Sequence, residues 1–337
     1  MKILMVSPCP MHPPNQGNRA RIRNLYQAIQ AAGHKVDFLN IKMENGDYDR
    51  DRDFVGEAYY HALDFTYNAA LPSIIRRLIK RFTDRQFLFY VNNALDDYCD
   101  KKTVDYVKAL DAVNHYDVIW VEYIFLSRIF EYFGQDKLKI LDTHDRFTDR
   151  YKLYIKDHKP YRWFSVSEED EKKALMRADV VVAIQEEEGD IFKRVMGDQR
   201  SVRVIGHQTE LKQMPLVNPK AMLFLASGNP LNIRTINYFV EEIMPMVRSE
   251  IHDAKLIIAG SVCQHLHWED DGIKTIGPVD TLEGAYGMAD IVINPIKWGT
   301  GLKIKCVEAL AYRRVLVTSS NGAAGLDSDN NNHFIIA

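Results

Sequence analysis

Residues 2–39 read KILMVSPCPMHPPNQGNRARIRNLYQAIQAAGHKVDFL, and this stretch decides the fold class. The apolar run at residues 2–6 predicts a buried strand, and the prolines of the loop after it exclude regular structure. Between residues 18 and 32 apolar side chains recur every three or four positions, which predicts an amphipathic helix ended by Gly33. A second strand is predicted at residues 36–39. Strand, loop, helix and strand form a βαβ unit, in which the two strands are parallel.

The same alternation continues to the end of the chain. Further strands are predicted at residues 118–121, 138–141, 180–184, 202–205, 222–226, 255–259, 273–276, 291–294, 315–318 and 333–337. Helices are predicted over most of 72–112 and at 233–249 and 302–311. Residues 212–219 contain two prolines and no periodicity, so we expect a linker there between domains at 1–212 and 213–337. The fold class is therefore α/β, with two Rossmann-like doubly wound domains facing a ligand-binding cleft.

Composition and charge exclude several function classes. The chain has 337 residues, of which 46% are hydrophobic and 26% charged, and its net charge is −3. A nucleic-acid-binding protein usually has a large basic excess, so we expect no nucleic-acid partner. No run of about 18 apolar residues is present, which argues against an integral membrane protein. The N-terminus lacks the pattern of a secretory signal and the four cysteines are scattered, so a reduced, cytoplasmic protein is expected.

Motifs in the C-terminal third have a recognisable order. Residues 276–280 read IGPVD, residues 286–290 read YGMAD, and residues 299–311 read GTGLKIKCVEALA. Gly322 and the pair Gly325-Leu326 follow. In this order the motifs resemble the donor site of GT-B glycosyltransferases of family 4, the glycosyl transferases group 1. Weaker similarities to the same family occur at 227–232 (SGNPLN) and around residues 17–36.

The resemblance implies a retaining transferase that moves a sugar from a nucleotide-diphosphate sugar to a glycan or lipid-linked acceptor. It implies neither a cofactor nor a metal. Lys305 is expected in the first turn of a helix, where its charge and the helix dipole would stabilise the leaving diphosphate. Glu308 lies on the same helix face and, as in the family, would accept hydrogen bonds from ribose hydroxyls. The donor-binding residues expected are Gly228, Asn232, Gly299, Thr300, Gly301, Leu302 and Glu308.

Residues of the first domain complete the expected site. His144 and Asp145 follow a predicted strand, and the resemblance implies that His144 contacts the transferred sugar while Asp145 orients it. Gly17, Asn18 and Arg21 would contact the diphosphate or the acceptor, with Arg19 as an alternative to Arg21. On the second domain, Asn232 has two interpretations, either a donor contact or the N-cap of the helix after it.

Two features depart from the family pattern. Thr300 stands where the family often has a glutamate that contacts the donor sugar, so recognition of that sugar is unassigned. This departure leaves open a catalytically silent sugar-nucleotide or glycan-binding subunit. A sugar-nucleotide epimerase of the same fold is a third possibility, but an epimerase would need a carboxylate at position 300 more than a transferase does. The chain also ends at the strand predicted for 333–337, without the C-terminal crossing helices that GT-B folds normally have.

Two further patterns have simpler interpretations. Asp49 and Asp51 have the spacing of a D-x-D metal motif, but they lie in a polar stretch and are expected in a solvated loop. Residues 72–90 combine an apolar stripe at helical spacing with five basic side chains. This stripe either faces the core or lies on an anionic membrane, which would hold the enzyme peripherally near a lipid-linked acceptor.

Overall fold

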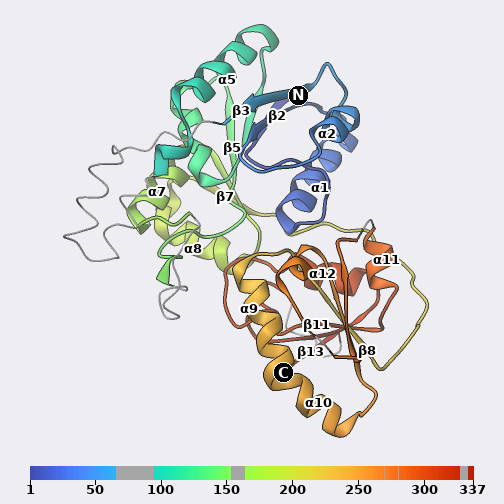
Figure 1. Cartoon of the computed structure of the whole chain (residues 1–337). Coiled ribbons are helices and arrows are strands. Elements are labelled where there is room, and N and C mark those ends of the chain that lie inside the picture. The colour runs from blue at the N-terminus through green and yellow to red at the C-terminus, as the bar shows by residue number, and fades with distance from the viewer. Residues whose placement is uncertain (66–94, 153–163, 269, 280, 327–332) are drawn as a thin grey trace, which may run out of the picture. The chain divides into compact units, whose positions relative to one another are not determined.

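The structure is a computed structural model, and it describes the chain except for residues 66–94, 153–163, 269, 280 and 327–332 (Figure 1). The basic stripe expected at 72–90 lies outside the described residues. Among the helices that are described, none is long and apolar enough to cross a membrane.

Two compact units make up the described chain. The first unit contains Met1–Pro13 and Leu25–Gly206, and the second contains Pro14–Asn24 and His207–Ala337. The expected linker at 212–219 contains no helix or strand. Each unit is built around its own parallel sheet, which confirms the two α/β systems predicted from the sequence.

The first unit is organised by a seven-stranded sheet in the order β3-β2-β1-β4-β5-β6-β7. All neighbouring strands are parallel. The strands are β1 (Lys2–Ser7), β2 (Lys35–Lys42), β3 (Tyr60–Asp64), β4 (Val118–Glu122), β5 (Leu138–Asp142), β6 (Val180–Ala183) and β7 (Ser201–Val204). The strand order reverses between β1 and β4. In open α/β sheets, ligands bind outside the carboxyl ends of the strands at such a reversal.

Helices connect these strands. They are α1 (Gly17–Ala31), α2 (Tyr48–Val55), α5 (Lys101–Asn114), α7 (Glu168–Met176) and α8 (Glu186–Met196), with the 3-10 helices η1 (Leu95–Tyr98), η2 (Ile124–Tyr132) and η3 (Gly197–Gln199). The part of α1 up to Asn24 belongs to the second unit. The expectation of a solvated loop at Asp51 is wrong. Asp51 lies on α2, is fully buried, and accepts a hydrogen bond from the Met11 amide at 3.1 Å while contacting His12 Nδ1 at 2.8 Å. A buried partner distant in the sequence therefore overrides the polar character of this stretch.

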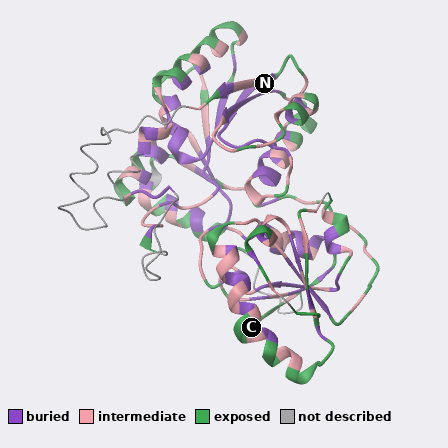
Figure 2. Ribbon diagram, viewed as in Figure 1, coloured by how far each residue is buried: buried purple, intermediate pink, exposed green. Residues whose placement is uncertain are grey.

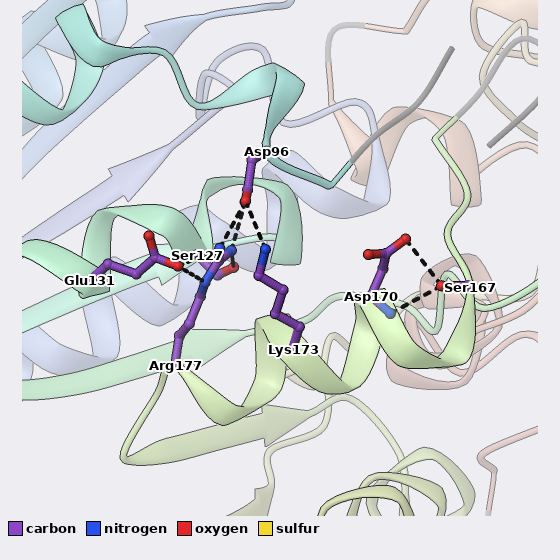
Figure 3. A network of polar contacts seen from close by, with 7 residues as sticks. All are labelled: Asp96, Ser127, Glu131, Ser167, Asp170, Lys173 and Arg177. Atoms are coloured by element: carbon purple, nitrogen blue, oxygen red, sulfur yellow. Dashed lines mark hydrogen bonds and ion pairs between the residues drawn. The ribbon is translucent and has the colours of Figure 1, made fainter. Parts of the chain in front are cut away.

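A polar network fixes η1 to the rest of the first unit (Figure 3). Asp96 on η1 accepts two hydrogen bonds from Arg177, at 2.7 and 2.9 Å, and one from Lys173 at 3.4 Å. Arg177 also bonds to Glu131 at 2.8 Å and to Ser127 at 3.1 Å. The network joins η1, η2 and the end of α7.

The second unit contains a six-stranded parallel sheet in the order β10-β9-β8-β11-β12-β13. Its strands are β8 (Ala221–Leu225), β9 (Lys255–Ala259), β10 (Ile273–Gly277), β11 (Ile291–Asn294), β12 (Val315–Thr318) and β13 (Phe334–Ile336). The helices are α9 (Pro230–Tyr238), η4 (Phe239–Ile243, a π-helical turn), α10 (Met244–Glu250), η5 (Ser261–His265), α11 (Leu282–Tyr286) and α12 (Ile304–Ala311).

Alternating side chains of this sheet pack on opposite faces. Phe224 and Leu256 belong to one apolar cluster that includes Ile236 of α9, while Leu223 belongs to another that includes Ala309 of α12. Strands covered on both faces consist of nearly continuous apolar residues, as the sequence showed. Figure 2 shows these strands buried and the outer helix surfaces exposed.

Candidate functional site

The loop between β11 and α12 is shaped by two glycines. Gly299 has φ +115° and Gly301 has φ +73°, a backbone region that glycine adopts without strain. Lys303, the N-cap residue of α12, donates hydrogen bonds from Nζ to the carbonyls of Thr300 at 3.0 Å and Gly301 at 2.7 Å. The side-chain amide of Asn321 donates a hydrogen bond to the Gly299 carbonyl at 3.1 Å. The loop is therefore fixed before any ligand binds.

Lys305 lies in the first turn of α12, as predicted. Its Nζ donates to Asn232 Oδ1 at 3.0 Å and lies 4.8 Å from the centre of the Phe224 ring. Burial of this ammonium lowers its pKa to about 8. The Lys305 ammonium therefore lies at the amino end of α12, and both the ammonium and the helix dipole favour a bound anion.

Asn232 is a partner of Lys305, and its expected role as N-cap is wrong. The cap of α9 is Asn229, whose side chain accepts a hydrogen bond from the Asn232 amide at 2.9 Å. Pro230 occupies the first turn, so the helix starts earlier than the apolar periodicity indicated. The Asn232 side chain donates to the Ser227 carbonyl at 3.0 Å, which leaves its oxygen to face Lys305.

Glu308 lies one turn after Lys305 and is buried. The hydroxyl of Tyr286 donates to Glu308 Oε2 at 3.2 Å and also lies 3.3 Å from the Lys305 carbonyl. Burial raises the pKa of Glu308 to about 7, against the opposing effects of the Tyr286 hydrogen bond and the Lys305 charge. Within the described residues no group bonds to Oε1, and this oxygen is not cut off from solvent. Glu308 therefore retains an acceptor that a ligand can use.

Gly228 lies where a larger residue would collide with its surroundings. Its amide donates to Ser261 Oγ at 2.9 Å, and a Cβ at this position would lie 2.8 Å from His265 Nε2. Leu302 and Thr300 are half-buried in the loop before α12. The predicted donor-binding residues thus lie along the β8–α9 and β11–α12 connections, which the Lys305–Asn232 hydrogen bond joins.

Gly17 belongs to the same compact unit as α12. A Cβ at Gly17 would lie 3.1 Å from Ile304 Cδ1, at the first residue of that helix. Asn18 accepts a hydrogen bond from the amide of Arg19 at 2.9 Å, and Arg21 is fully buried. Gly17, which was predicted for the phosphate or acceptor side, therefore approaches the first residue of α12 closely.

The first unit presents His144 and Asp145 immediately after β5. His144 Nε2 lies 2.5 Å from Glu122 Oε2 at the end of β4, and its backbone is in the left-handed region with φ +61°. Asp145 pairs with Arg150 at 2.9 Å. Sequence reasoning missed Glu122, Lys303 and Tyr286 as contacts of the site. An acidic residue that ends an apolar strand next to the strand before His144 is the signal that could have found Glu122.

Comparisons with known proteins bear on this site. Residues 219–337 match the sequence model of a family described as "Glycosyl transferases group 1". These residues contain Lys305, Glu308 and the glycine loop. Residues 219–337 therefore carry the sequence pattern of this family.

A protein of Klebsiella pneumoniae named "Uncharacterized 44.6 kDa protein in cps region" is 23% identical over 361 residues, covering 100% of this chain and 87% of that protein. Sucrose-phosphate synthase from Thermosynechococcus elongatus is 16% identical with a TM-score of 0.63, over 96% of this chain and 82% of that one. TarM is 10% identical with a TM-score of 0.65, over 99% and 88%. Alr3699/HepE of Anabaena, solved in complex with UDP and glucose, is 13% identical with a TM-score of 0.61, over 100% and 85%.

The whole chain therefore has the GT-B fold, and the protein is a glycosyltransferase. Both expectations drawn from the order of the C-terminal motifs are confirmed. The family match includes Lys305 and Glu308, so we expect the groups that bind the donor to lie around these two residues.

Proposed function

We propose that this glycosyltransferase transfers a sugar, with retention of anomeric configuration, from a nucleotide-diphosphate sugar to a glycan or lipid-linked acceptor. The observation that carries the proposal is the paired arrangement of Lys305 and Glu308 at the amino end of α12, beside a preformed glycine loop. One end of this arrangement suits a diphosphate and the other suits a ribose.

Lys305 and the positive end of the α12 dipole stabilise the departing diphosphate. Negative charge on that group grows as the glycosidic bond breaks, so a fixed cation binds the transition state more tightly than the ground state. Gly299 and Gly301 let the loop backbone approach the phosphates without a Cβ in the way. In this proposal no resident cofactor or metal is required, because Lys305 and the helix dipole supply the positive charge.

Glu308 recognises the nucleoside. Its Oε1 accepts a hydrogen bond from a ribose hydroxyl, while Tyr286 holds Oε2 and thereby fixes the carboxylate plane. His144 contacts the transferred sugar and Asp145 orients it. Gly228, Asn232, Thr300 and Leu302 line the donor side, and Gly17, Asn18 and Arg21 serve the phosphate or acceptor side.

The relatives support this assignment of donor and acceptor. Alr3699/HepE was solved with UDP and with UDP-glucose. The Klebsiella relative is named for a cps region, which fits a role in polysaccharide biosynthesis. The family-4 resemblance of the motif order supports retention, and a peripheral position at the inner face of a membrane would place the enzyme near a lipid-linked acceptor.

A thermal-shift screen followed by product analysis tests the proposal. UDP, GDP, dTDP and their sugars are added in turn, and a true donor raises the melting temperature by mass action. The accepted donor is then incubated with glycan and lipid-linked acceptors, and the anomeric configuration of the product is read by NMR. Retention is expected. Binding without transfer would indicate a silent binding subunit, and interconversion of the sugar nucleotide without acceptor would indicate an epimerase.

A further inference from the structure

Glu122 and His144 are brought together at the carboxyl ends of two neighbouring strands. Glu122 ends β4 and is paired in register with Asp142, the last residue of β5. His144 follows two residues later, and both side chains are almost completely buried, with 0% and 5% of their surfaces exposed. The Glu122–His144 contact of 2.5 Å therefore lies in a water-poor setting, where hydrogen bonds are strong.

Both carboxylate oxygens of Glu122 are engaged by specific donors. Trp120 Nε1 donates to Oε1 at 2.8 Å, and Oε2 faces His144 Nε2 at 2.5 Å. An indole nitrogen can only donate, so Oε1 must act as an acceptor. An ionised carboxylate has no hydrogen to give to Nε2. The contact then requires that His144 carries a hydrogen on Nε2.

The imidazole ring is fixed in orientation as well as in tautomer. The Tyr123 ring stacks on it with a centroid distance of 4.1 Å and an interplanar angle of 5°. The His144 amide donates to Asp142 Oδ1 at 3.3 Å. Tyr123 and His144 both have positive φ, at +69° and +61°, a strained conformation that is retained at functional sites.

The other ring nitrogen, Nδ1, remains open to a ligand. Among the described residues nothing bonds to Nδ1, and it is not one of the polar atoms sealed from solvent. In the tautomer with hydrogen on Nε2, Nδ1 carries no hydrogen and can accept a hydrogen bond. A sugar hydroxyl is the kind of donor that such an atom binds.

Metal binding explains this cluster less well. Ligand atoms of Glu122, Asp142 and His144 lie within 4.8 Å of one another. Two ligands of one zinc ion, each about 2.0 Å from the metal, stand roughly 3 Å apart. The 2.5 Å contact between Nε2 and Oε2 is shorter, as expected for a direct hydrogen bond.

We propose that Glu122 is a positioning residue, which locks His144 in the tautomer with hydrogen on Nε2 and presents Nδ1 as the acceptor for a hydroxyl of the transferred sugar. The contact with the sugar rests on the proposed function, whereas the tautomer lock rests on the Trp120–Glu122–His144 hydrogen bonds alone.

Trp120 makes the lock testable. In Glu122→Gln the single amide oxygen must accept from the Trp120 indole, so the amide nitrogen faces His144 and donates to Nε2. The histidine hydrogen then moves to Nδ1, which becomes a donor. In the double variant Trp120→Phe/Glu122→Gln the indole donor is absent, so the amide can rotate and accept from Nε2–H again.

The tautomer is measured by ¹⁵N NMR of histidine-labelled protein without substrate, with the His144 signals assigned by their loss in His144→Gln. We expect Nε2–H in the wild type, Nδ1–H in Glu122→Gln, and Nε2–H in the double variant. Melting curves of all variants confirm that each is folded. The same tautomer in the wild type and in Glu122→Gln would overturn the lock, whether or not the protein transfers sugar.

Activity tests the second half of the proposal. Glu122→Gln should lower kcat/KM by about 10- to 100-fold, by analogy with the cost of removing the group that orients a metal-bound histidine. The double variant should recover part of that loss although it carries one more substitution. A tautomer that switches as expected while kcat/KM stays at the wild-type value would overturn the role of Nδ1 in the reaction.

Discussion

Lys305 and Asn232 are joined by a 3.0 Å hydrogen bond across 73 residues of sequence. It connects the first turn of α12 with the first turn of α9, so the amino ends of two helices converge on one cation. Burial lowers the pKa of Lys305 to about 8, which shows that this cation is held with incomplete compensation. In the proposed function, an incoming diphosphate would supply the missing negative charge.

Replacing Lys305 should therefore impair the chemical step. Lys305→Ala is expected to lower kcat/KM by about 10²- to 10³-fold, the range for losing one donor to a developing negative charge. Lys274→Ala, at an exposed position on β10, is the matched control and should leave activity unchanged. Wild-type kcat/KM in a folded Lys305→Ala protein would contradict the assignment of the donor site.

The lowered pKa of Lys305 also predicts a pH dependence. The protonated form binds the diphosphate, so affinity should fall as the pH rises through about 8, where the free protein loses this proton. Calorimetry with the nucleoside diphosphate between pH 7 and 9.5 measures the effect. The alkaline fall should vanish in Lys305→Ala, and its persistence there would assign it to another group.

Glu308 should cause nucleotide affinity to fall at low pH, the opposite of the effect of Lys305. Burial raises its pKa to about 7, and the ionised form is the one that accepts hydrogen bonds from ribose. Affinity for the nucleotide should therefore fall as the pH decreases through about 7. Glu308→Gln removes this pH dependence and weakens binding by about 1–3 kcal/mol. Glu250→Gln, on an exposed surface, is the control, and equal affinity in Glu308→Gln and the wild type would show that Glu308 is structural.

Much of the fold follows from local sequence. The bounds predicted at 255–259, 291–294 and 315–318 match β9, β11 and β12, because strands buried on both faces are uninterrupted apolar runs. Helix α2 and strand β3 were not predicted. They lie in a polar stretch, and Asp51 on α2 is stabilised by a contact with His12, which no local pattern reveals.

The candidate site could also be predicted only in part, because local spacing is visible in the sequence and contacts between distant residues are not. Lys305 and Glu308 are separated by one helical turn, so their spacing predicts a shared face. The hydrogen bond between Glu122 and His144 depends on which strands are neighbours in the sheet, and the sequence alone does not fix that order. The position of Asn232 was misjudged because two asparagines lie three residues apart, and Pro230 decides which of them caps α9.

Gly322 offers a test of the packing behind the donor loop. A Cβ there would lie 2.0 Å from Thr318 Oγ1 and 2.8 Å from the Asn294 carbonyl, which are themselves hydrogen-bonded at 2.9 Å. Gly322→Ala should therefore lower the free energy of unfolding by about 1–3 kcal/mol through overpacking. Gly206→Ala is the control, since its nearest neighbour is 4.0 Å away. Equal denaturant midpoints for the two variants would show that the loop relaxes freely.

The Asp96–Arg177 pair should stabilise the first unit in a pH-dependent manner (Figure 3). Burial of Asp96 opposes its ionisation, but the hydrogen bonds and charge of Arg177 outweigh this effect and lower the pKa of the carboxyl. A carboxyl with a lowered pKa in the folded state adds stability that is complete above its ordinary pKa and is lost as the pH falls through the lowered value. Arg177→Met keeps an unbranched side chain but removes the guanidinium and with it both bonds to Asp96. Because Asp96 is partly exposed, we expect the free energy of unfolding to fall by about 2 kcal/mol near pH 7.

The difference in stability between Arg177→Met and the wild type should shrink below about pH 4, since a protonated Asp96 no longer favours the charged partner. Urea titrations at pH 7, 5 and 3.5 measure it, with Arg200→Met as a control at an exposed position. A difference that stays constant over this range would show that Arg177 stabilises the fold through packing and its other contacts rather than through Asp96.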